Sequence, residues 1–248
     1  MSIETLSFRA AGGRRMRGWL AEPAGDRPVA GVLLIHEILG LVDNQRAVLE
    51  RFAAEGYVAF APDLFDRPGA RALCIARALN DLRRGEGEVI EDLRAALRFL
   101  RARPRVAGPR LGVAGFCMGG GFALLMALEP DVGAVAPFYG TSPAYLDHVA
   151  DSCPVVASFG GRDVVFRALG EQLRGALERA GIEHDYRIYE DAGHSFMTGA
   201  LPGLAGQLAA IGPLRVGYDP SAAADSWSRL LVFFDRFVRP PADRGGAP

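Results

Sequence analysis

A cysteine stands at the centre of a short motif, Gly-Phe-Cys-Met-Gly at residues 115–119, whose spacing suits a nucleophile. An apolar run at 111–114 precedes the motif, and a helix-like apolar run at 122–128 follows it. This pattern predicts a strand, a sharp turn and a helix, with Cys117 exposed at the turn as in the G-x-S-x-G nucleophile elbow. The glycines would let the strand and the helix approach closely, and the helix N-terminus would favour a thiolate. The alternative interpretation is a glycine-rich turn around an inert structural cysteine.

A cysteine nucleophile requires a histidine base and an acid that orients the histidine, and the chain offers both. Asp163 follows an apolar run and two glycines, and His194 lies in a Gly-His-Ser-Phe loop after the last predicted strand. Of the other histidines, His36 precedes the cysteine, and the remaining two flank predicted elements and are expected at the surface. Taken singly, Asp163 could be a helix cap and His194 an ordinary loop residue. Together with Cys117 they occur in a nucleophile–acid–histidine order, and we predict a catalytic triad.

The elements that must position these residues alternate between strands and helices. Strands are expected at 29–35, 57–61, 111–114, 134–139, 155–159 and 185–189, preceded by a hairpin of 3–8 and 16–21. Helices are expected at 43–55, 71–83, 89–103, 168–180 and 222–238. Such alternation predicts an α/β fold with a mostly parallel sheet of about eight strands and helices on both faces. In such folds the functional site lies at the carboxyl ends of the strands, where the triad residues occur.

The organisation of the chain indicates one domain. No internal repeat or linker divides residues 1–240. Residues 199–219 form a Gly/Pro-rich stretch of weak periodicity, which we interpret as an insertion or a lid-like loop. Residues 241–248 carry no structure signal, and we expect them to be a disordered tail.

Glu37 follows the strand at 29–35 directly, where a carboxylate is costly unless it has a partner or meets water. This strand end neighbours the elbow, so we expect the backbone N–H groups of Ile38 and Met118 to form the oxyanion hole. Simple exposure of Glu37 is the alternative. A metal site at His36 and Glu37 is not favoured, because adjacent strand residues point to opposite faces.

Composition narrows the classes of function. The 248 residues carry a net charge of −1, so the composition does not indicate a basic surface that would bind nucleic acid or an acidic membrane. Every basic residue is arginine, so lysine Schiff-base chemistry is excluded. The three cysteines show no zinc or disulfide spacing, and neither a signal peptide nor a membrane-length apolar run is present. We expect a cytoplasmic protein, monomeric or a small homo-oligomer, with a small-molecule substrate and no metal.

Several motifs together resemble the dienelactone hydrolase family. They are His-Glu-Ile-Leu-Gly at 36–40, Ala-Pro-Asp-Leu-Phe at 61–65, the elbow at 115–120, Phe-Tyr-Gly at 138–140, Gly-Gly-Arg-Asp at 160–163 and Ala-Gly-His-Ser-Phe at 192–196. The resemblance implies an α/β-hydrolase fold and a cytoplasmic hydrolase of esters or lactones that uses a Cys-His-Asp triad and no cofactor. It also implies that Glu37 hydrogen-bonds the resting cysteine and helps to deprotonate it.

One departure from the family pattern bears on the substrate. The founding enzymes bind the substrate carboxylate through an arginine shortly after the histidine motif, whereas this chain has Met-Thr-Gly-Ala at 197–200. The pattern therefore does not specify dienelactone itself, and we expect a small carboxylic ester, lactone or thioester as the substrate, cleaved through a thioester at Cys117. The alternative function is that of a non-catalytic or redox-sensing homologue in which Cys117 is an oxidisable thiol.

Overall fold

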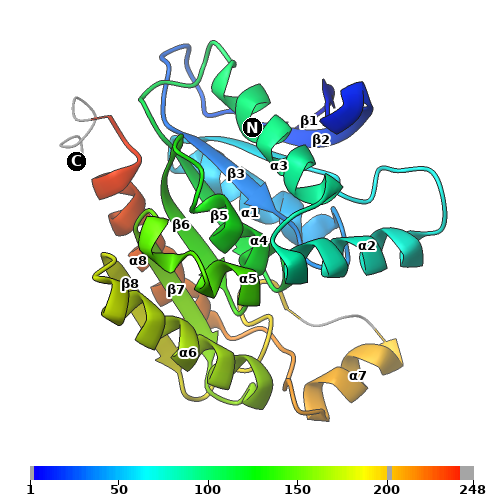
Figure 1. The fold of residues 1–248 in the computed structure, drawn as a ribbon, viewed down its shortest axis with the longest axis vertical. Coiled ribbons are helices and arrows are strands. Elements are labelled where there is room, and N and C mark those ends of the chain that lie inside the picture. Colours follow the sequence, from blue (N-terminus) through cyan, green and yellow to red (C-terminus); the bar gives the residue numbers. More distant parts are fainter. Residues whose placement is uncertain (1–2, 200–202, 241–248) are drawn as a thin grey trace.

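The computed structural model describes residues 3–199 and 203–240, and its centre is an eight-stranded sheet in the order β1-β2-β4-β3-β5-β6-β7-β8 (Figure 1). The hairpin of β1 and β2 and the pairing of β2 with β4 are antiparallel, while the pairings from β4 through β8 are parallel. The predicted α/β fold with a mostly parallel sheet is thus confirmed. The strands are β1 (Ile3–Arg9), β2 (Arg15–Ala21), β3 (Gly31–Ile35), β4 (Val58–Pro62), β5 (Leu111–Phe116), β6 (Val132–Phe138), β7 (Val155–Gly160) and β8 (His184–Tyr189).

Helices cover both faces of the sheet because its central strands are apolar on both sides. In β3, Val32 and Leu34 pack into one core, and Leu33 and Ile35 pack into the other. The first core is completed by α1 (Asp43–Ala54) and α8 (Pro220–Phe237). The second is completed by α3 (Glu88–Arg101), α4 (Met118–Met126) and α6 (Val164–Ala180), with α2 (Arg71–Arg84) packed outside against α3 and α4. The short α5 (Pro143–Leu146) follows β6.

Two predicted segments differ from the structure. The stretch 199–219, expected as an insertion or loop, contains α7 (Gly203–Ile211), which lies apart from the sheet at the lower right of Figure 1. Its Leu- and Ala-rich sequence favours a helix once the preceding Gly and Pro are passed. Helix α6 begins at Val164 rather than at 168, because Asp163 caps it. The tail at 241–248, expected to be disordered, lies outside the described residues.

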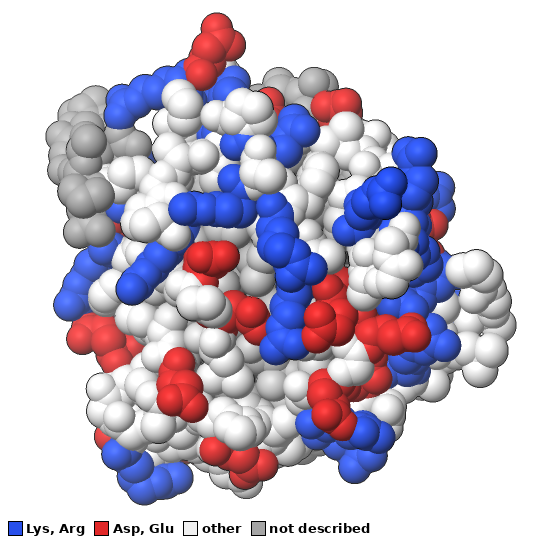
Figure 2. Space-filling view, turned by 45° about the horizontal axis from the view of Figure 1, so that its top comes forward, with Lys and Arg blue, Asp and Glu red and all other residues white. Residues whose placement is uncertain are grey.

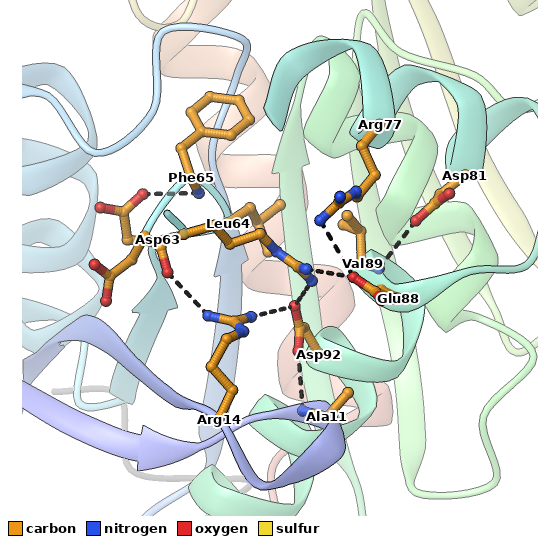
Figure 3. Close-up of polar contacts among 12 residues, drawn as sticks. Ala11, Arg14, Asp63, Leu64, Phe65, Arg77, Asp81, Glu88, Val89 and Asp92 are labelled. Carbon is orange, nitrogen blue, oxygen red and sulfur yellow. Dashed lines mark hydrogen bonds and ion pairs between the residues drawn. The ribbon is translucent and has the colours of Figure 1, made fainter. Parts of the chain in front are cut away.

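A cluster of buried ion pairs fixes the segment that follows β4 (Figure 3). Asp92 of α3, whose side chain is only 1% exposed, accepts from the guanidinium groups of Arg14 and Arg67 and from the backbone N–H of Ala11. Arg14 also donates to the backbone carbonyl of Asp66 at 2.9 Å. Three segments distant in sequence, the turn after β1, the loop after β4 and α3, are thereby joined.

Surface charges of both signs are mixed. Figure 2 shows one face of the molecule, on which arginine side chains lie beside acidic ones. Pairs such as Arg174 with Glu178 on α6 recur along the exposed helix faces. On this face the charges therefore form no broad area of one sign, which fits the net charge of −1.

Candidate active site

Cys117 lies at the turn between β5 and α4 in a strained backbone conformation, with φ 53° and ψ −118°. A non-glycine residue with positive φ is uncommon and carries strain that the surrounding structure must hold. The backbone N–H of Cys117 donates to the carbonyl of Phe138 at 3.0 Å, which anchors the turn to β6. At Gly119 a Cβ atom would lie 2.2 Å from the carbonyl oxygen of Ile35, so only glycine allows α4 to approach β3. The strand–turn–helix predicted around the cysteine is present.

Asp163 and His194 are brought into direct contact. The distance from His194 Nδ1 to Asp163 Oδ2 is 2.6 Å, and both side chains are buried. Asp163 Oδ1 accepts from the backbone N–H groups of Val165 and Phe166 at 3.1 and 3.0 Å. Asp163 is therefore both the helix cap that the sequence offered as an alternative and the partner of His194.

Residues 213–217 belong to the stretch that we expected to be an insertion or a lid-like loop, and they hold the loop that carries His194. The N–H of His194 donates to the carbonyl of Leu214 at 2.8 Å, and its carbonyl accepts from Gly217 at 3.0 Å. A Cβ atom on Gly193 would lie 1.7 Å from the carbonyl oxygen of Arg215, so this close approach requires glycine. The segment after α7 thus anchors the loop that carries the histidine.

The surroundings of His194 favour its protonated form. Burial by itself would lower the pKa of His194, but its hydrogen bonds with Asp163 and Cys117 outweigh that effect and raise the pKa to about 9. The rings of Tyr139 and Phe166 lie against the imidazole, with centroid distances of 4.9 and 4.8 Å. The imidazole is thus positioned between the carboxylate of Asp163 and the sulfur of Cys117, as a base for a thiol must be.

Glu37 is buried, with 6% of its surface exposed, so simple exposure is excluded. Its Oε1 accepts from Gln45 at 3.2 Å, and its Oε2 accepts from the Ser195 hydroxyl at 3.5 Å. Burial raises the pKa of Glu37, and a hydrogen bond with Thr198 opposes that rise. These contacts, rather than one with Cys117, hold the carboxylate in this structure, and its action on the cysteine stays a prediction.

Sequence reasoning missed three residues that line the inner side of the site. Gln45 is fully buried on α1 and bonds to Glu37, and Thr198 bonds to the hydroxyl of Tyr139 at 3.1 Å. Burial raises the pKa of Tyr139 well above its usual value, and the neighbouring Glu37 raises it further. The signal that could have singled out Gln45 was its polar side chain on the apolar face of α1, three residues before Val48.

His36, which lies next to the candidate active site, has a structural role. Its Nε2 accepts from the backbone N–H of Leu64 at 3.0 Å, so its Nδ1 carries the hydrogen and donates to the carbonyl of Glu37 at 2.7 Å. Complete burial lowers the pKa of His36, which favours this neutral form. The imidazole therefore joins the loops that follow β3 and β4.

A cavity of about 360 Å³ opens beside the sulfur of Cys117. Ile38 and Met118 line it together with Cys117. Within the part of the chain that the structure describes, the backbone N–H groups of Ile38 and Met118 donate to no loop or cap acceptor. Both N–H groups are thus free to bind an oxygen atom of a ligand.

Neither a metal site nor a membrane helix is found in the described ranges. No group of three or more His, Cys, Asp or Glu side chains there could hold a metal ion. None of the helices described is both long and apolar enough to cross a bilayer.

The chain is similar to known proteins in sequence and in fold. Residues 16–238 match the model of the dienelactone hydrolase family. A protein of Synechocystis sp. that carries the name "Putative carboxymethylenebutenolidase" is 32% identical over 243 residues, which cover 89% of this chain and 91% of that protein. A crystal structure from Klebsiella pneumoniae, described as a "Putative Dienelactone Hydrolase", has 25% identity and a TM-score of 0.77 over 96% of this chain and 100% of its own.

A third comparison bears on the fold alone. A dienelactone hydrolase-like promiscuous phosphotriesterase from metagenomic libraries is 23% identical and superimposes with a TM-score of 0.80, covering 96% of this chain and 98% of its own. The match to the family model spans nearly the whole chain, from β2 to the end of α8. This chain therefore belongs to the dienelactone hydrolase family and is a hydrolase with the α/β-hydrolase fold.

Proposed function

We propose that this protein hydrolyses small carboxylic esters or lactones, with Cys117 as nucleophile and a thioester as intermediate. One observation supports the proposal above the others. Cys117 lies at a strained turn, its interaction with His194 helps to raise the pKa of that imidazole, and His194 Nδ1 lies 2.6 Å from the carboxylate of Asp163. A nucleophile, a base and an orienting acid thus stand in the order that acyl transfer requires.

The proposed reaction has two stages. His194 Nε2 holds the proton of the Cys117 thiol, and the sulfur attacks the ester carbonyl carbon. The negative charge that develops on the carbonyl oxygen is stabilised by the backbone N–H groups of Ile38 and Met118. The carbon–oxygen bond to the alcohol breaks, and the alcohol leaves with the proton from His194. In the second stage His194 takes a proton from water, the resulting hydroxide attacks the thioester, and the acid is released as the proton returns to the sulfur.

Glu37 is the fourth proposed catalytic residue, on the basis of the family resemblance. Burial raises its pKa, which makes its carboxylate a better proton acceptor than an exposed one. In our proposal it accepts the thiol proton when a ligand displaces its bonds to Gln45 and Ser195, and it passes this proton to His194, which delivers it to the alcohol. Replacing Glu37 with Gln keeps the size and removes the acceptor, so the acylation of Cys117 by p-nitrophenyl butanoate should then require a higher pH. An unchanged pH profile would remove Glu37 from the mechanism.

The test of the function is the turnover of p-nitrophenyl esters and simple lactones by the wild type, Cys117→Ala and Cys117→Ser. The half-buried Cys153 supplies the control, as Cys153→Ala. We expect activity in the wild type and the control, no activity in Cys117→Ala, and an acyl adduct at Cys117 by mass spectrometry after rapid quenching. Absence of turnover, with Cys117 still oxidised by peroxide, would favour the redox-sensing alternative. Because the thiol must be reduced to act, we place the protein in the cytoplasm.

A further inference from the structure

We propose that the cavity beside Cys117 binds the acyl group of the ester, and that this acyl group is uncharged and apolar. This inference rests on the proposed function and names its class of substrate. The cavity volume, about 360 Å³, is near the lower end of the range of about 300–1,000 Å³ for small-molecule sites. The site therefore suits a compact ligand.

The walls of the cavity are hydrocarbon. Beyond Ile38, Cys117 and Met118, its lining comes from α2, from the segment that includes α5 and from α6. Only two of these remaining residues, Thr141 and Gln172, are polar. The lining outside the strand ends consists of Leu79, Leu82, Thr141, Pro143, Leu146, Phe166, Leu169 and Gln172.

No charged side chain lines this cavity in the described parts of the chain. Among the arginines of α2 and α6, Arg71 donates to the carbonyl of Leu39. Arg77 pairs with Glu88 at 3.2 Å, and Arg167 pairs with Glu190 at 2.8 Å. In the sequence, residues 200–206 also contain no charged residue. A carboxylate on the substrate would lose its hydration in this cavity without gaining a partner, which strongly disfavours its binding.

The position of the cavity indicates that it binds the acyl group of the ester and not the alcohol group. Cys117, Met118 and Ile38 line it, so it adjoins the sulfur and the proposed oxyanion donors. His194, which must donate a proton to the departing alcohol, does not line it; Phe166 lines the cavity and packs against the imidazole, with ring centroids 4.8 Å apart. The acyl group stays bonded to the sulfur after the alcohol leaves, and the cavity beside the sulfur would hold it during that interval.

The volume of the cavity predicts the length of the acyl chain that fits it best. The volume equals that of about twelve water molecules in the liquid, each taking about 30 Å³. An acyl chain of roughly six to eight carbons, with its ester group, would fill this space. Shorter chains would leave part of the apolar wall uncovered.

The experiment compares kcat/KM for p-nitrophenyl acetate, butanoate, hexanoate, octanoate and dodecanoate. We expect an increase of about fourfold per added methylene up to roughly octanoate, followed by a decline. The hemisuccinate ester, which ends in a carboxylate, should be cleaved at least about 100-fold more slowly than the pentanoate ester. Acetate esters of alcohols of increasing length should show no such rise.

A pair of variants on one helix tests the charge argument. Leu79 lines the cavity and is 45% exposed, so an arginine there can be accommodated without disturbing the core. Leu79→Arg should reduce the preference for pentanoate over hemisuccinate at least about tenfold. Leu73 lies on the same helix, is 68% exposed and does not line the cavity, so Leu73→Arg should leave the preference unchanged.

The outcomes separate the two proposals. Turnover that depends on Cys117 but is insensitive to acyl length, or faster for hemisuccinate, would overturn the apolar acyl site and leave the hydrolase intact. A rise with alcohol length in place of acyl length would overturn it as well. Absence of any turnover dependent on Cys117 would overturn the proposed function itself, and this inference with it.

Discussion

Replacing Asp163 with Asn separates the two tasks of one carboxylate. In the wild type Oδ2 contacts His194 Nδ1 at 2.6 Å, and Oδ1 caps α6 through the N–H groups of Val165 and Phe166. An asparagine oxygen can keep both cap bonds, but its NH₂ group then faces Nδ1. His194 would have to accept at Nδ1 and carry its hydrogen at Nε2, where it can no longer take a proton from Cys117. If the amide of Asp163→Asn were flipped, its oxygen would again accept from His194 Nδ1. Its NH₂ group would then face the backbone N–H groups of Val165 and Phe166, which are also donors.

The size of each effect follows from these contacts. The wrong tautomer of His194 should lower kcat by about 10⁴-fold, the loss that the same substitution causes in serine triads. Because Asn and Asp are equivalent helix caps, Asp163→Asn should be more stable than Asp163→Ala by about 1 kcal/mol. The pKa of His194 should fall from about 9, since the hydrogen bond with Asp163 helps to hold it there.

Three measurements check this reasoning. They are the turnover of p-nitrophenyl butanoate, urea unfolding of the wild type and both variants, and titration of the His194 ring by NMR. Asp163→Asn that keeps more than about a tenth of wild-type activity would refute the orienting role. Equal stability of the two variants would refute the role of Asp163 as a cap.

Three further predictions concern His194, the ion-pair cluster and the elbow. The folded-state pKa of His194, about 9, exceeds the unfolded value near 6.5, so the contribution of His194 to stability is complete below about pH 6.5 and is lost as the pH rises through about 9. The difference in unfolding free energy between the wild type and His194→Gln should therefore shrink over that pH range. A difference that stays constant with pH would contradict the raised pKa. Asp92→Ala leaves two arginines without their buried partner and should lower the free energy of unfolding in urea by about 3–5 kcal/mol. Glu178→Ala, which removes an exposed ion pair, should lower it by less than about 1 kcal/mol. Equal losses for the two variants would show that the cluster does not stabilise the fold. Gly119→Ala places a Cβ atom 2.2 Å from the carbonyl of Ile35 and should abolish soluble expression or activity, while Gly175→Ala, which meets only the flexible end of Arg179, should be neutral or stabilising in a thermal melt.

The sequence predicted the parts of the fold and site that depend on local pattern. Continuous apolar runs marked the buried strands, and the ends of those strands carry Cys117, Asp163 and the loop of His194. The contact between Asp163 and His194 was expected from the rule that parallel strand ends share one edge of the sheet. Their catalytic roles remain proposals.

What the sequence could not supply depends on contacts between distant segments. Gln45, Thr198 and Tyr139 surround the inner side of the site, yet no short spacing links residues from α1, β6 and the histidine loop. The start of α6 was placed at 168 although the helix-cap alternative for Asp163 would have placed it at Val164, where the structure has it. Helix α7 was missed because the flanking Gly and Pro residues suggested a loop, while tertiary context decides such short segments.

The place of β8 in the sheet has a consequence for how activity is lost. β8 is an edge strand, paired only with β7, and each of its residues keeps some exposure to solvent, whereas β5, which leads to Cys117, is buried throughout. Local opening of a protein begins in such weakly packed edges and costs less free energy than global unfolding. Because His194 follows β8, fraying of this edge would withdraw the base while the strand before the nucleophile stays folded. We therefore expect the enzyme to lose activity at a lower denaturant concentration than the one that unfolds the core. The stability of the sheet edge at β8 would then determine the highest denaturant concentration at which the protein is active.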